Sequence, residues 1–143
     1  MPAVFVIDRS ATEPSPLVQG LIIAGYHTLC LADCNTALET LQCVRPDLMV
    51  IDVAAMSVDA AVGLLHVLGA SVDAKAAVPV LVVGATLSDC RALGGLLKRG
   101  EILPAMRSTP EDVVARVRRY VDAMWPPTTR RVISPARRVW GGA

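Results

Sequence analysis

Aromatic residues are scarce in this sequence of 143 residues, where they make up 3% against 53% hydrophobic residues in all. The core must therefore be built from Val, Leu, Ile, Ala and Met, which favours helices on a Val/Ile/Leu-rich sheet over an aromatic-rich β-sandwich. No stretch reaches about 18 uninterrupted apolar residues, and no basic segment followed by a long apolar run opens the chain. We therefore expect a cytoplasmic protein without membrane association.

Several catalytic and ligand-binding motifs are also missing. Neither G-x-G-x-x-G nor G-x-x-x-x-G-K-[ST] occurs, which disfavours dinucleotide and nucleoside-triphosphate binding, and no G-x-S-x-G elbow supports hydrolase chemistry. We expect no enzyme activity. The cysteines show no C-x-x-C spacing: they are Cys30, Cys34, Cys43 and Cys90. We expect reduced structural thiols, with Cys30 and Cys43 buried in apolar runs, and a disulfide or metal role as the alternative.

Acidic residues are absent from residues 126–143, which hold four of the 14 basic residues. The preceding residues carry the other 10 bases against 13 acids, a net charge of −3. We therefore divide the chain into a domain at residues 1–125 and a basic, flexible tail at 126–143. The alternative is a peptide arm that docks on a partner through Trp140. Four charges alone predict only weak nucleic-acid binding.

Short apolar runs and helical patterns alternate along the domain. We expect strands at residues 3–7, 27–31, 47–52, 79–83 and 102–103. We expect helices at residues 17–24, 60–68 and 88–98. A further helix begins at a cap, Asp33 or Asn35, and ends at Pro46. The last helix has Thr109 as its cap and Pro110 in its first turn. Strict β–α alternation implies right-handed crossovers. The predicted fold is α/β, a doubly wound five-stranded parallel sheet of flavodoxin-like topology with helices on both faces.

Two of the predicted strands are followed or ended by an acid. Asp8 comes directly after the first strand, and Asp52 ends the third. Ligands of doubly wound sheets bind at the carboxyl ends of the strands, near the point where strand order reverses. We therefore expect Asp8 and Asp52 to face one crevice.

Four segments together resemble the receiver domain of two-component response regulators: VFVID, RPDLMVIDVAAMSVDA, PVLVV and TPEDVVARV. The resemblance covers residues 3 to about 124. It implies that Asp52 is the acceptor of a phosphoryl group from a histidine kinase, and that Asp8 is one of two acids that help to hold Mg²⁺. It also implies a hydroxyl side chain at the end of the fourth strand and a Lys at the end of the fifth, both contacting the phosphoryl oxygens.

The remaining signature positions depart from the family. Arg9 stands in place of the second acid, Gly84 in place of the hydroxyl residue with Thr86 two residues on, and Ala105 in place of the Lys. An Arg9 guanidinium could pair with the two acids and lower the pKa of Asp52. It would also compete with Mg²⁺, so we expect metal binding to be weakened.

These departures favour a pseudo-receiver that signals through protein–protein interaction. The first alternative is a receiver phosphorylated on Asp52 in a phosphorelay, and a weaker one is a flavodoxin-like binder of a small ligand. The expected partner is a histidine kinase or a downstream signalling protein, with a homodimer as a further alternative. The resemblance places the partner surface on the last two helices and the fifth strand, at Arg91, Leu97, Arg107, Arg116 and Tyr120.

Overall fold

The computed structural model describes residues 2–8, 15–69 and 77–124. Its five parallel strands lie in the order β2-β1-β3-β4-β5. They are β1 (Ala3–Ile7), β2 (His27–Leu31), β3 (Leu48–Asp52), β4 (Val80–Ala85) and β5 (Gly100–Pro104). The helices are α1 (Pro16–Ile23), α2 (Cys34–Leu41), α3 (Val58–Gly69), α4 (Leu87–Leu93) and α5 (Pro110–Met124), with 3₁₀ turns η1 (Val53–Ala55) and η2 (Ala105–Arg107). The predicted α/β fold is confirmed.

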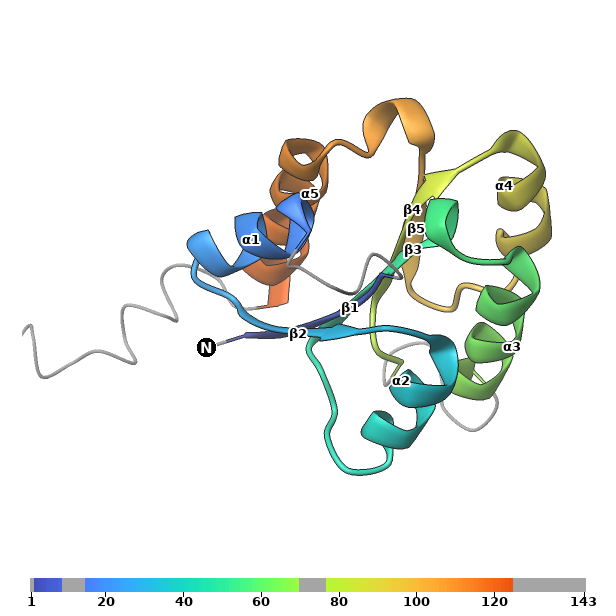
Figure 1. Ribbon diagram of the computed structural model, residues 1–143, viewed down its shortest axis with the longest axis horizontal. Coiled ribbons are helices and arrows are strands. Elements are labelled where there is room, and N and C mark those ends of the chain that lie inside the picture. The colour runs from blue at the N-terminus through green and yellow to red at the C-terminus, as the bar shows by residue number, and fades with distance from the viewer. Residues whose placement is uncertain (1, 9–14, 70–76, 125–143) are drawn as a thin grey trace, which may run out of the picture.

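The sheet is covered on both faces, by α1 and α5 on one side and by α2, α3 and α4 on the other (Figure 1). Successive strand residues point to opposite faces, so each strand contributes to two separate cores. In β1, Val4 and Val6 pack towards α1 and α5, whereas Phe5 and Ile7 pack towards α2, α3 and α4. Burial on both faces is why the strands are continuous apolar runs rather than alternating ones.

Side chains cap α2 and α5 at their amino ends, as the turn chemistry predicted. The Asp33 carboxylate accepts a 2.7 Å hydrogen bond from the Thr36 amide, so Asp33 rather than Asn35 caps α2. The Thr109 hydroxyl accepts from the Asp112 amide at 3.1 Å at the start of α5. On α5, Val113, Val117 and Val121 form the fully buried stripe.

Two predicted helices are shorter in the structure. For α4 we expected Ser88 as the cap and an end at residue 98, and both predictions are wrong. The cap is Thr86, and the helix ends at Leu93. Gly94 follows as the carboxyl cap, because a glycine pair destabilises a helix interior. The helix α2 ends at Leu41, five residues before the Pro46 that was expected to end it.

The fifth strand is longer than expected and begins at Gly100, two residues before its predicted start. Gly100 has a φ of +123°, and a Cβ there would collide with the backbone of Val80 on the neighbouring strand. This close approach, together with the left-handed backbone, requires glycine.

The four cysteines are free. The expectation that Cys30 and Cys43 are buried is wrong: both are exposed, since Cys30 lies on the edge strand β2 and Cys43 follows the end of α2. Within the described residues, no helix combines the length and apolar character needed to cross a membrane.

Candidate functional site

Asp8 and Asp52 lie side by side at the carboxyl edge of the sheet. The strands that lead to them, β1 and β3, are adjacent, and Ile7 is in register with Ile51. Asp8 is only 5% exposed, and Asp52 is half-buried. Parallel pairing of the two strands thus brings both acids to the same end of the sheet, side by side. Arg9, the third residue that the sequence assigned to this site, lies outside the described residues.

The Asp52 carboxylate is held by the turn that follows it. Its Oδ1 accepts a 3.0 Å hydrogen bond from the Ala54 amide, and through this bond Asp52 caps η1. Burial raises the pKa of Asp52, the Ala54 hydrogen bond opposes this, and the nearby Asp8 carboxylate raises it further. From the sequence we predicted that Arg9 lowers the pKa of Asp52. The described residues around Asp52 instead raise its pKa.

Gly84 lies against Asp52, at the position where the resemblance calls for a hydroxyl side chain. Its φ is +71°, a left-handed conformation that side chains other than glycine rarely adopt. A Cβ built on Gly84 would lie 2.9 Å from the Ala54 Cβ and 3.0 Å from the Asp52 Oδ1. A side chain at residue 84 therefore has neither the backbone conformation nor the room it needs.

Ser108 is a site residue that the sequence analysis missed. The Gly84 amide donates a 2.9 Å hydrogen bond to the Ser108 Oγ, and this hydroxyl lies 2.8 Å from the Pro104 carbonyl oxygen, to which it donates. Ser108 follows η2, so one side chain joins the ends of β4 and β5 to the turn before α5. No local signal could have revealed it, because its partner lies 24 residues away in the chain.

Thr86 does not take the place of the missing hydroxyl. It is exposed and caps α4, with its Oγ1 accepting from the Asp89 amide at 3.1 Å. The Asp89 carboxylate in turn accepts from the Thr86 amide at 2.9 Å, which completes a capping box. Ala105, at the Lys position, is the exposed first residue of η2.

The donor set meets the lower limit of what Mg²⁺ requires. Mg²⁺ commonly takes one or two carboxylates from a protein and completes its shell with water and phosphate oxygens. Asp8 and Asp52 would hold the ion, and its charge would mask the repulsion between a carboxylate and an incoming phosphate. Among the residues the structure describes, no group of three or more His, Cys, Asp or Glu side chains could hold a metal.

Three residues of the predicted partner surface, Arg107, Arg116 and Tyr120, lie together on η2 and α5, next to the edge strand β5. Tyr120 and Arg116 line a hollow of about 310 Å³, and Arg116 and Arg107 line an adjoining one of about 170 Å³. Arg116 on α5 forms an ion pair with Glu101 on the edge strand β5, with 3.1 Å between Nη1 and Oε1. Burial raises the pKa of Tyr120, and the Glu101 carboxylate beside it adds to the rise.

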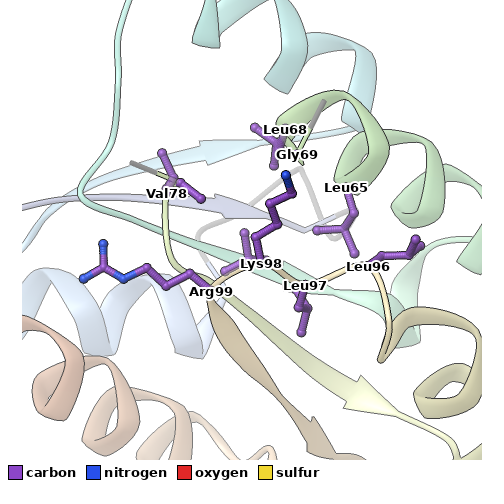
Figure 2. A pocket seen from close by; sticks show the side chains of 10 residues that line it. Leu65, Leu68, Gly69, Val78, Leu96, Leu97, Lys98 and Arg99 are labelled. Carbon is purple, nitrogen blue, oxygen red and sulfur yellow. The ribbon is translucent and has the colours of Figure 1, made fainter. Parts of the chain in front are cut away.

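The other two residues of that surface lie elsewhere. Arg91 is exposed on α4, but Leu97 follows the end of this helix and packs against the core. Figure 2 shows Leu97 lining a small cavity together with Leu65 and Leu68. With about 20 Å³ of space, the cavity holds roughly one water molecule and no larger ligand.

No family model matches the chain, and no curated protein matches it. Solved structures do. The signal receiver domain of a signal transduction histidine kinase from Syntrophus aciditrophicus is 19% identical, with a TM-score of 0.68 over 86% of this chain and 92% of the other. The chemotaxis response regulator CheY4 of Vibrio cholerae is 22% identical, with a TM-score of 0.64 over 84% and 98%. A structure described as a transiently phosphorylated "switch" in bacterial signal transduction is 22% identical, with a TM-score of 0.66 over 85% and 95%. The chain therefore has the fold of response-regulator receiver domains, as its sequence predicted.

Proposed function

We propose that this chain is a pseudo-receiver, a signalling module of two-component systems that acts through protein–protein interaction without a phosphoryl switch. The observation that carries the proposal is Gly84. Its φ of +71° and the 3.0 Å approach of a built Cβ to the Asp52 Oδ1 exclude a hydroxyl side chain beside the acceptor position. A phosphoryl group on Asp52 would therefore have no hydroxyl at residue 84 with which to form a hydrogen bond.

The neighbouring hydroxyls are engaged elsewhere. Thr86 caps α4, and Ser108 bonds to the Gly84 amide and the Pro104 carbonyl. Ala105 carries no charge with which to hold a phosphoryl oxygen. In this proposal, none of these residues reports phosphorylation to the rest of the domain.

The two hollows on β5 and α5 provide the interaction surface in this proposal. They share Arg116 and Arg119, so they form one continuous area. Arginine and tyrosine are the residue types most often found at the energetic centres of interfaces. The partner is a histidine kinase or a downstream signalling protein in the cytoplasm, or a second copy of this chain.

Intact mass spectrometry after incubation with Mg²⁺ and acetyl phosphate tests the proposal. We expect no added phosphoryl mass on the natural chain, and none on Asp52→Ala or Asp59→Ala. Asp59→Ala is the control, since it changes an exposed acid on α3. Binding to its partner should be equal with Mg²⁺ plus acetyl phosphate and with EDTA. Arg119→Glu should weaken that binding, whereas Arg118→Glu, at an exposed α5 position outside both hollows, should not.

A phosphorylated receiver is the second candidate, and the position of Asp52 favours it. The carboxylate is half-buried rather than enclosed, and Asp8 lies beside it at the end of the adjacent strand. One phosphoryl group on the natural chain and on Asp59→Ala, but none on Asp52→Ala, would establish this candidate and refute the first. In that reaction an Asp52 oxygen attacks the phosphorus and acetate leaves.

A further inference from the structure

Two sulfur atoms meet at the amino ends of α2 and α3, helices that lie side by side (Figure 1). Cys34 is the first residue of α2, and its Sγ lies 3.9 Å from the Met56 Sδ, to which the thiol donates. Met56 lies between η1 and α3, 22 residues further along the chain. Two separate segments of the fold thus bring a thiol and a thioether together.

Both sulfur-bearing side chains line a hollow of about 240 Å³. Cys34 is only 8% exposed and Met56 is half-buried, so a ligand would reach the two sulfurs through this hollow. A water molecule takes up about 30 Å³, which leaves room in the hollow for an ion and for further small ligands. The rest of the wall is formed by small or polar residues: Ala32, Asp33, Ser57 and Ala60.

The charges around the hollow suit a cation that binds to a thiolate. The Asp33 carboxylate belongs to the wall and directly precedes Cys34, so it contributes negative charge beside the sulfur. When a metal ion binds, the thiol proton leaves to solvent and the sulfur becomes a thiolate. This thiolate lies at the amino end of α2, where the helix dipole stabilises a negative charge.

The two donor types indicate which ion fits. Thiolate and thioether are soft ligands, which favour Cu(I) and Zn²⁺ over the hard ions Mg²⁺ and Ca²⁺. A structural Zn²⁺ site takes four protein ligands, and the described part of the chain holds no group of three His, Cys, Asp or Glu side chains for a metal. Two metal–sulfur bonds of about 2.3 Å bridge a gap of 3.9 Å at an angle of about 115°, so one ion can bind both sulfurs where they stand.

We propose that Cys34 and Met56 form a binding site for Cu(I) at the amino ends of α2 and α3. The Cys34 thiolate and the Met56 thioether are the two protein ligands, and the hollow holds what completes the coordination. The bound ion links the start of α2 to the segment between η1 and α3. This inference is independent of whether Asp52 accepts a phosphoryl group, since Asp52 does not line the hollow.

An anaerobic titration of the full chain with Cu(I), in competition with the chelator bicinchoninate, tests the proposal. The other three cysteines also bind Cu(I) as single thiols, so the reference is the triple variant Cys30→Ser/Cys43→Ser/Cys90→Ala. We expect this reference to bind one Cu(I). Adding Met56→Leu, which conserves volume and apolar character, should weaken binding by more than about tenfold, the least that even an outer-shell substitution costs at a metal site. Adding Cys34→Ser should abolish the binding.

The matched control is Met106→Leu in the same reference, which removes an exposed thioether outside the hollow and should leave the affinity unchanged. Methyl NMR with ¹³C-labelled methionine gives a second readout on the reference itself. One equivalent of Cu(I) should shift the Met56 signal and leave those of Met106 and the fully buried Met49 in place.

Equal affinities with and without Met56→Leu would overturn the proposal, because Cys34 would then bind Cu(I) as an ordinary thiol. A Met106 signal that shifts as much as the Met56 signal would overturn it as well, since the ion would then bind thioethers without selection. Both readouts are separate from the phosphorylation assay on Asp52, so either proposal can fail without the other.

Discussion

The Gly84 amide and the Ser108 Oγ are 2.9 Å apart and hydrogen-bonded across 24 residues of chain. Ser108 also lies 2.8 Å from the Pro104 carbonyl and 3.3 Å from that of Leu103, so its hydroxyl proton has an acceptor at the end of β5. The bond therefore connects the ends of two neighbouring strands next to Asp52.

Ser108→Ala should destabilise this region. The substitution leaves the Gly84 amide without its acceptor, and an unsatisfied half-buried donor costs about 1–3 kcal/mol. Hydrogen exchange should become faster at the Gly84 amide than at amides in the centre of β1. Exchange that stays unchanged at Gly84 would show that water replaces the hydroxyl at no cost.

Gly84→Ser should fail to restore a receiver site and should destabilise the fold by about 1–3 kcal/mol, because the left-handed backbone and the contact with the Ala54 Cβ both oppose a side chain. Gly63→Ala is the matched control. Gly63 lies within α3 with open space around it, so alanine there should stabilise by about 0.5–1 kcal/mol. Urea denaturation of both variants measures the two effects. A neutral Gly84→Ser would mean that β4 can adopt another backbone at its end.

Thr86→Ala should cost about 1 kcal/mol through loss of the α4 capping box, whereas Thr86→Ser should keep the stability of the natural chain. Thermal unfolding of both variants measures the difference. Neither change should alter the outcome of the acetyl phosphate assay. A phosphorylation level that fell in Thr86→Ala and recovered in Thr86→Ser would instead place this hydroxyl in the acceptor site.

Asp52→Asn should stabilise the fold at neutral pH, and this gain should disappear in acid. The folded-state pKa of Asp52 lies above its ordinary value of 3.8, so the charged carboxylate disfavours the folded state above the raised pKa. The penalty falls as the pH drops through that pKa and is absent below 3.8. Melting temperatures measured between pH 3 and pH 8 should therefore converge at the acid end. Asp59→Asn, at an exposed position, serves as the control, and a gain that is independent of pH would contradict the electrostatic cause.

The alternation of strands and helices could be predicted because both faces of the sheet are buried. This burial makes β1 and β3 continuous apolar runs, and it places Asp8 and Asp52 where adjacent parallel strands end. Helix starts at Asp33 and Thr109 could be predicted as well, since capping depends on a residue and its near neighbours.

What could not be predicted depends on contacts between distant residues. The role of Ser108 depends on the end of β4, and the requirement for glycine at residue 100 depends on the backbone of Val80. Exposure of Cys30 follows from the place of β2 at the sheet edge, which an apolar run does not reveal. Leu97 is only partly exposed and packs against the core, because α4 ends four residues earlier, which a helical pattern in the sequence does not reveal.

The left-handed backbone of Gly84 also bears on how this domain could be redesigned or could evolve. A single substitution adds a side chain, but it does not by itself change a backbone conformation that excludes side chains. A hydroxyl residue at position 84 would have to coincide with a new path for the end of β4, a new place for η1, and release of the Ser108 bond. A hydroxyl residue is therefore difficult to introduce at position 84 by one substitution alone.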